Sequence, residues 1–91
     1  MSDPLDQMQE LRDRIGANDS AIVAAVNERL RLVAELWRLK DEHGTARLDP
    51  DRERHLRALL ADANGGPLSA DGLDSLVSEL LALTKRELGG G

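Results

Sequence analysis

The chain has 91 residues, of which 41% are apolar, with one aromatic residue, Trp37, and no cysteine. This length suits one small domain rather than two, and the lack of cysteine excludes disulfides, thiol catalysis and cysteine-ligated metals. The formal net charge is −5 and no basic block occurs, which argues against a nucleic-acid-binding surface. We therefore expect a single domain over residues 1–91. With one aromatic residue its core must consist of Leu, Val, Ile and Ala, which suits packed helices, so we expect an all-α fold.

The first predicted element is one long helix over about residues 5–42. Apolar residues recur along it at steps of three, four or seven, the spacing of one helix face. This apolar stripe consists of Met8, Leu11, Ile15, Ile22, Val26, Leu30, Val33 and Trp37. Residues 16–20 contain a glycine and three good N-cap residues, so a helical hairpin is the alternative. The apolar phase continues through them without a proline, which favours one continuous helix.

Two shorter helices follow. Gly44 is typical of a residue just past a helix end, and Asp49 followed by Pro50 is a strong start signal for a helix over about 50–63. Ser69 can cap a third helix over about 70–88. The apolar positions expected to face inward are Leu56, Leu59 and Leu60 on the second helix and Leu73, Leu76, Val77, Leu80, Leu81 and Leu83 on the third.

Three cations share the apolar stripe of the long helix. By helical spacing Arg12, Arg29 and Lys40 fall on the stripe, whereas Arg31 and Arg38 project to the opposite side. A charge directed toward a core is costly unless something pairs it. Either protein carboxylates or an anionic ligand must compensate these cations, and Arg29 and Lys40 lie about 16 Å apart along one face.

The length of the first helix predicts a partner chain. A helix over residues 5–42 is roughly 57 Å long, whereas a compact domain of this size has a radius of gyration of about 12–13 Å. Two short helices cannot cover such a rod, so we expect an intertwined homodimer. An antiparallel partner would then supply Arg12 to a site in the other chain.

The shorter helices add polar groups that face the same interior. Asp49, Arg52 and Glu53 open the second helix, and Thr84 lies on the third. With the stripe cations they predict an anion-binding cavity that has one carboxylate and no evident nucleophile. The structural alternative is that the charges extend to solvent or form ion pairs, such as Arg29 with Glu53.

Metal and membrane sites are not expected. His43 and His55 are isolated, without the spacing of metal ligands. The N-terminus is polar and acidic, and no apolar run approaches the length needed to span a membrane. These patterns are typical of a soluble cytoplasmic protein.

Four runs, at residues 11–15, 27–33, 38–40 and 49–53, resemble the AroQ-type chorismate mutases. The resemblance covers about residues 7–84 and is carried by the order and spacing of the runs. It implies an all-α enzyme that forms intertwined dimers from one long and two shorter helices. It also implies rearrangement of chorismate to prephenate in aromatic amino-acid biosynthesis, a unimolecular reaction that needs no cofactor.

The resemblance assigns roles on the long helix by position. Arg12 is similar to the family arginine that enters the partner's active site. Arg29 is similar to the arginine that binds a substrate carboxylate, and Lys40 to the lysine that contacts the ether oxygen and a carboxylate. We expect Arg29 and Lys40 to be catalytic and Arg12 to bind substrate.

On the second and third helices, Glu53 resembles the catalytic acid that holds the substrate hydroxyl. Asp49 and Arg52 resemble substrate-binding residues beside Glu53 at the entrance of the active site, and Thr84 occupies what is usually a serine position. The chain departs from the family at Leu88, where many members have a Gln or Glu that donates to the ether oxygen; Glu87 is adjacent.

Other functions stay open at this point. Some actinobacterial members have similarly altered C-termini and weak activity until they bind the first enzyme of the shikimate pathway, so the resemblance extends to an activating partner of this kind. An amino-deoxychorismate mutase or an isochorismate pyruvate lyase would use the same scaffold. A non-catalytic helical dimerisation or regulatory module is the alternative from another class, and the missing Gln supports it.

Overall fold

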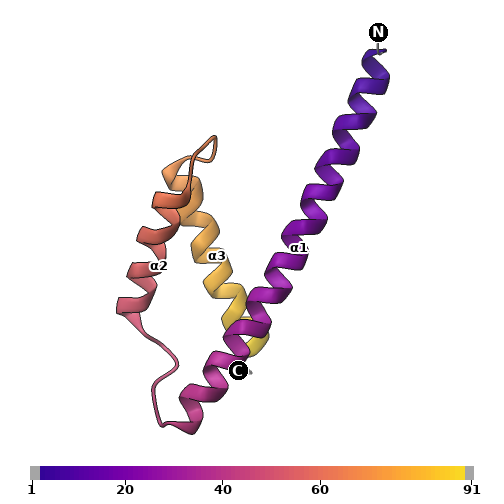
Figure 1. Ribbon diagram of the computed structural model, residues 1–91. Helices are drawn as coiled ribbons and strands as arrows, with labels where there is room; N and C mark the ends of the chain where they lie inside the picture. The colour runs from indigo at the N-terminus through magenta and orange to yellow at the C-terminus, as the bar shows by residue number, and fades with distance from the viewer. Residues whose placement is uncertain (1–2, 90–91) are drawn as a thin grey trace. The chain divides into compact units, whose positions relative to one another are not determined.

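The computed structural model describes residues 3–89, which form three α-helices and no strand (Figure 1). Helix α1 spans Pro4–Glu42, α2 spans Pro50–Ala63 and α3 spans Ala70–Leu88. The predicted all-α class, with one long helix and two shorter ones, is confirmed. Residues 1–2 and 90–91, which the single-domain prediction includes, lie outside the described residues, and that prediction stays untested.

Helix α1 runs without a break through residues 16–20, so the helical-hairpin alternative is wrong. One glycine inside a helix costs about 1 kcal/mol relative to alanine. Starting a second helix costs more, about 4 kcal/mol from a nucleation constant near 10⁻³. A continuous helix is therefore favoured, because the cap residues at 18–20 would have to offset a second nucleus.

The end of α1 is a Schellman turn built on Gly44, as predicted. Gly44 has φ +69°, in the left-handed region that favours glycine. Its N–H donates to the Asp41 carbonyl at 3.3 Å, and the Thr45 N–H donates to the Lys40 carbonyl at 2.8 Å. These two bonds are the pair that defines the motif, and they place Lys40 in the last turn of α1.

Both shorter helices begin at the caps that the sequence indicates. The Asp49 side chain accepts from the Arg52 N–H at 3.1 Å, and Pro50 is the first helical residue. The Ser69 hydroxyl oxygen accepts from the Gly72 N–H at 3.0 Å.

The chain divides into two compact units between Leu32 and Val33, inside α1, so both shorter helices belong to the second unit.

The second unit has a small core where α2 and α3 pack against each other. Among residues 3–89, only Val77 (2% exposed) and Thr84 (5%) are buried. The inward prediction was wrong for Leu59 and Leu76, which are 53% and 50% exposed in the chain. Each helix packs through a narrower face than its apolar set, because only one neighbouring helix covers it.

Arg57 joins α2 to α3. Its Nη1 donates to Asp74 Oδ1 at 2.6 Å and its Nη2 to Ser78 Oγ at 3.2 Å. The Arg57 side chain is 30% exposed and that of Asp74 is 73% exposed, so water screens the pair on one side. This contact links two helices that share few buried apolar residues, and we expect it to contribute to stability.

Replacing Arg57 with methionine should lower the free energy of unfolding by about 1 kcal/mol, because two charge-assisted hydrogen bonds between helices are lost while the apolar stem remains. Urea denaturation at one fixed chain concentration measures the change. Arg54→Met is the matched control, since the ion pair that Arg54 makes, with Asp51, lies within its own helix. Equal losses in the two variants would contradict a role in joining the helices.

Candidate active site

The stripe on α1 is half-buried at two of the three positions where cations were predicted, Arg29 and Lys40, whereas the third, Arg12, is exposed in the single chain. Six residues of the helix are half-buried: Val26, Arg29, Leu30, Val33, Trp37 and Lys40. The rest of α1, including Arg12, is exposed, and the side chains of Arg31 and Arg38 are 71% and 53% exposed. The prediction that Arg29 and Lys40 lie on the buried face, and Arg31 and Arg38 on the solvated face, is confirmed.

Lys40 is held by the loop between α1 and α2. Its Nζ donates to the Arg47 backbone carbonyl, seven residues on, at 3.1 Å. Within residues 3–89 the Lys40 ammonium contacts no carboxylate. A carbonyl oxygen is a neutral acceptor, and a lysine ammonium has three N–H donors. The contact therefore orients the ammonium and leaves its charge and two donors for an anion.

The first turn of α2 brings Asp49, Arg52 and Glu53 together. Asp49 Oδ1 caps the helix through the Arg52 N–H, and the Glu53 N–H donates to the Asp49 carbonyl at 3.0 Å. Glu53 Oε1 accepts from Arg57 Nη2 at 3.4 Å, a long contact with a side chain that also bonds to α3. The exposed Arg52 guanidinium has no ion-pair partner in the part of the chain that the structure describes.

On α3, Thr84 faces the interior of the second unit. It is 5% exposed, and its hydroxyl donates to the Leu80 carbonyl at 2.7 Å, a bond within the helix. The α-helix is regular to Leu88, which is half-buried, whereas Glu87 is exposed. Residues three and four apart are neighbours on a helix surface, so spacing puts both residues near Thr84, and burial shows that Leu88 rather than Glu87 turns toward the interior.

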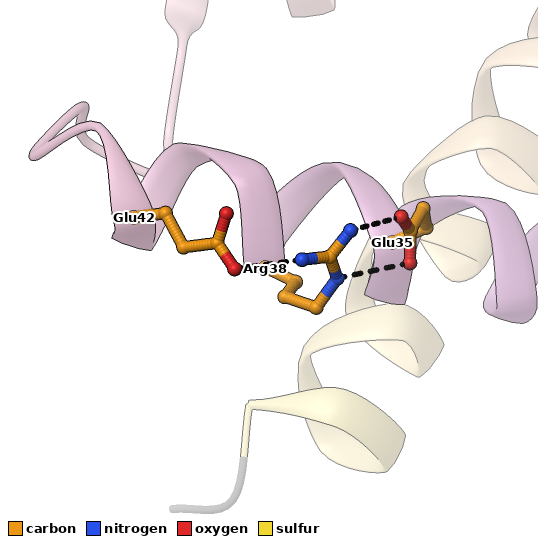
Figure 2. Close-up of polar contacts among 3 residues, drawn as sticks. All are labelled: Glu35, Arg38 and Glu42. Atoms are coloured by element: carbon orange, nitrogen blue, oxygen red, sulfur yellow. Dashed lines mark hydrogen bonds and ion pairs between the residues drawn. The ribbon is translucent and has the colours of Figure 1, made fainter.

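Arg38 shows how the solvated face of α1 uses its charges. It lies between Glu35 and Glu42, with Nε to Glu35 at 3.1 Å and Nη1 to Glu42 at 2.7 Å (Figure 2). The hydrogen bond and the charge of Arg38 lower the pKa of the Glu35 carboxyl below its usual value. These exposed pairs stabilise the helix locally and add little to overall stability.

Carboxylate pairing separates most arginines from the predicted site cations. The arginines with a carboxylate partner are Arg31, Arg38, Arg47, Arg54, Arg57 and Arg86. Over residues 3–89, Arg12, Lys40 and Arg52 have no such partner, and neither do Arg14 and Lys85. Lack of a partner alone does not mark a site. Lys40 is distinguished because it is also half-buried.

Arg12 and Arg29 belong to the first unit, and the other predicted site residues belong to the second. Among residues 3–89, no group of three or more His, Asp or Glu side chains could hold a metal ion. No helix within that range is long and apolar enough to cross a membrane.

A family model described as "Chorismate mutase type II" matches residues 11–87. The chain belongs to this chorismate mutase family. The structure is similar to that of form I of chorismate mutase from Thermus thermophilus, with a TM-score of 0.82 and 32% identity over 86% of this chain and 98% of that one. Form II of the same protein gives a TM-score of 0.81 at 32% identity, over 86% and 89% of the two chains. The curated proteins contain no significant match.

Family membership confirms the AroQ-type resemblance and places the chain among the isomerases that rearrange chorismate. The match spans α1 from Leu11 through nearly all of α3. It therefore covers every predicted site residue, from Arg12 to Thr84.

Two residues near the site were not predicted from the sequence. Arg47 contacts Lys40 through its carbonyl, and Arg57 contacts Glu53 through its guanidinium. Arg57 had a signal, since it follows Glu53 by four residues on one helix face. Arg47 had none, because a loop residue has no periodicity from which its direction can be inferred.

Proposed function

We propose that the chain converts chorismate to prephenate in the cytoplasm, in two equivalent active sites of an intertwined homodimer. The observation that carries the proposal is the ammonium of Lys40, a half-buried residue: a neutral carbonyl orients this ammonium, and no carboxylate within residues 3–89 neutralises it. A cation kept in this state is suited to a buried anionic ligand. Chorismate, with two carboxylates and an ether oxygen, is such a ligand.

The exposed apolar side chains of α1 support the dimer. In the single chain Leu5, Met8, Leu11, Ile15 and Ile22 are between 49% and 70% exposed. A monomer rarely exposes a continuous apolar stripe of this kind. The core of the second unit is also small, so a second chain that covers the stripe supplies apolar burial that one chain lacks. The antiparallel approach brings Arg12 to the partner's site.

The proposed mechanism needs binding and charge stabilisation only. Arg29 and the partner chain's Arg12 bind the two carboxylates, for which a planar guanidinium is suited. They hold the substrate in the compact conformer that brings the two reacting carbons together. Lys40 stabilises the negative charge that develops on the ether oxygen as the carbon–oxygen bond breaks.

The remaining groups position the substrate. Glu53 accepts from the substrate hydroxyl, and its contact with Arg57 restrains the carboxylate for this purpose. Asp49 and Arg52 form the polar entrance of the active-site cavity, and Thr84 closes the cavity at its inner end. Leu88 offers no donor to the ether oxygen, which leaves that task to Lys40. This favours a partner, such as the first enzyme of the shikimate pathway, that raises activity by tightening the site.

Incubating the purified chain with chorismate tests the activity directly. Depletion of chorismate with formation of prephenate, identified by mass spectrometry and by its acid conversion to phenylpyruvate, is the expected result. Amino-deoxychorismate and isochorismate are assayed in parallel. Faster turnover of either compound would identify that compound, rather than chorismate, as the substrate. Chorismate binding without turnover, alone and with the shikimate-pathway enzyme, would favour the non-catalytic module, the alternative that Leu88 supports.

A further inference from the structure

Arg47 is fixed against the last turns of α1 by two contacts. Its Nε and Nη2 donate to the two carboxylate oxygens of Asp41, at 3.1 and 2.7 Å, in a bidentate pair. Its guanidinium carbon lies 5.1 Å from the centre of the Trp37 ring, within the range of a cation–π contact. Trp37 and Asp41 are four residues apart and therefore share one helix face. We name this arrangement of Trp37, Asp41 and Arg47 the loop clamp.

The loop clamp determines where the Arg47 carbonyl lies. The loop from residue 43 to residue 49 leaves α1 through the Gly44 turn and must return to start α2 at Pro50. The Arg47 side chain anchors the loop to α1 six residues after Asp41. Its backbone carbonyl is then held over the helix end, where it accepts from Lys40 Nζ at 3.1 Å.

This geometry bears on catalysis because a lysine side chain is flexible. Its four-carbon stem carries about 2 kcal/mol of rotamer entropy, part of which is lost whenever the ammonium is localised. A group that is already oriented before substrate binds avoids that loss in the transition state. A carbonyl oxygen orients the ammonium without neutralising its positive charge, whereas a carboxylate in the same place would neutralise it.

We propose that Arg47 is a positioning residue for Lys40: its side chain clamps the loop, and its carbonyl presents the ammonium to the substrate. The inference rests on the proposed function for its effect on turnover, though not for its effect on Lys40 itself. Arg47 does not touch the substrate in this scheme. Arg47 acts through Lys40, so we expect loss of the Arg47 side chain to disturb the Lys40 ammonium more than it disturbs the fold.

The chain contains only two lysines, Lys40 and Lys85, which gives the test an internal reference. Lys85 is exposed, and its ammonium has no hydrogen-bond partner over residues 3–89. With ¹⁵N-labelled lysine, the protons of the Lys40 ammonium should exchange with water more slowly than those of Lys85. In Arg47→Met the Lys40 exchange should accelerate by about fivefold, the factor expected from one net hydrogen bond.

Turnover supplies the second readout. Arg47→Met should lower kcat/KM for chorismate by about tenfold. The loss should fall mainly on kcat, because charge on the ether oxygen develops only in the transition state. Arg38→Met is the matched control. Arg38 lies at the same end of α1, binds Glu35 and Glu42, and does not touch the loop. It should change neither readout.

Asp41→Asn keeps the Arg47 side chain and weakens the clamp, so it should move both readouts in the same direction by a smaller factor. It also serves if Arg47→Met fails to fold. Unchanged Lys40 exchange in folded Arg47→Met or Asp41→Asn would overturn the proposal, whatever the rates do. If the wild-type chain lacks chorismate turnover, the proposed function fails, while the exchange comparison still decides whether the clamp orients Lys40.

Discussion

Replacing Lys40 with alanine is expected to lower kcat for chorismate by about 10²–10³-fold, the usual cost of losing one group that stabilises developing negative charge. The fold should survive, because the side chain makes one hydrogen bond, to a loop carbonyl, in the described chain. That bond contributes only about 1 kcal/mol. Prephenate formation, circular dichroism and the thermal midpoint, measured on one preparation, separate the two effects.

Lys85→Ala is the control for the Lys40 variant, because Lys85 is the other lysine and is exposed. Its turnover should match that of the wild type. Arg29→Ala should also lower turnover strongly, with a larger rise in KM than Lys40→Ala if Arg29 binds a carboxylate in the ground state as well. Near-wild-type rates in folded Lys40→Ala and Arg29→Ala proteins would refute the assigned site.

Mixing two inactive variants should restore activity if the sites are shared between chains. Arg12→Ala and Arg29→Ala each lack one arginine at both sites of their own homodimer. In a hybrid dimer, one site combines an intact Arg29 with the partner's intact Arg12, and the other site lacks both. Random exchange makes half of the dimers hybrid, so about a quarter of the wild-type activity should return.

The recovery must depend on subunit exchange. Chains that carry different affinity tags show when hybrids have formed, and activity should rise with the hybrid fraction. Arg12→Ala mixed with a second preparation of Arg12→Ala is the control and should stay inactive. If tagged hybrids form and no activity returns, Arg12 does not serve the partner's site.

The helices and their ends followed from local chemistry and could be predicted closely. The Gly44 turn and the Asp49 and Ser69 caps depend on bonds between residues three to five apart. The apolar spacing placed Arg29 and Lys40 on the half-buried face for the same reason. Leu59 and Leu76 were predicted incorrectly, because periodicity shows which side of a helix is apolar and not how much of that side a neighbour covers.

The sequence by itself thus determined three helices, their boundary signals and the side of α1 on which Arg29 and Lys40 lie. Only the tertiary structure decided that the Lys40 ammonium meets the Arg47 carbonyl, and that Arg57 joins α2 to α3. Helix hydrogen bonds and caps connect near neighbours, so residue types at short spacing predict them. A loop that folds back on a helix depends on turn geometry and on side-chain contacts across elements, which no periodic pattern encodes.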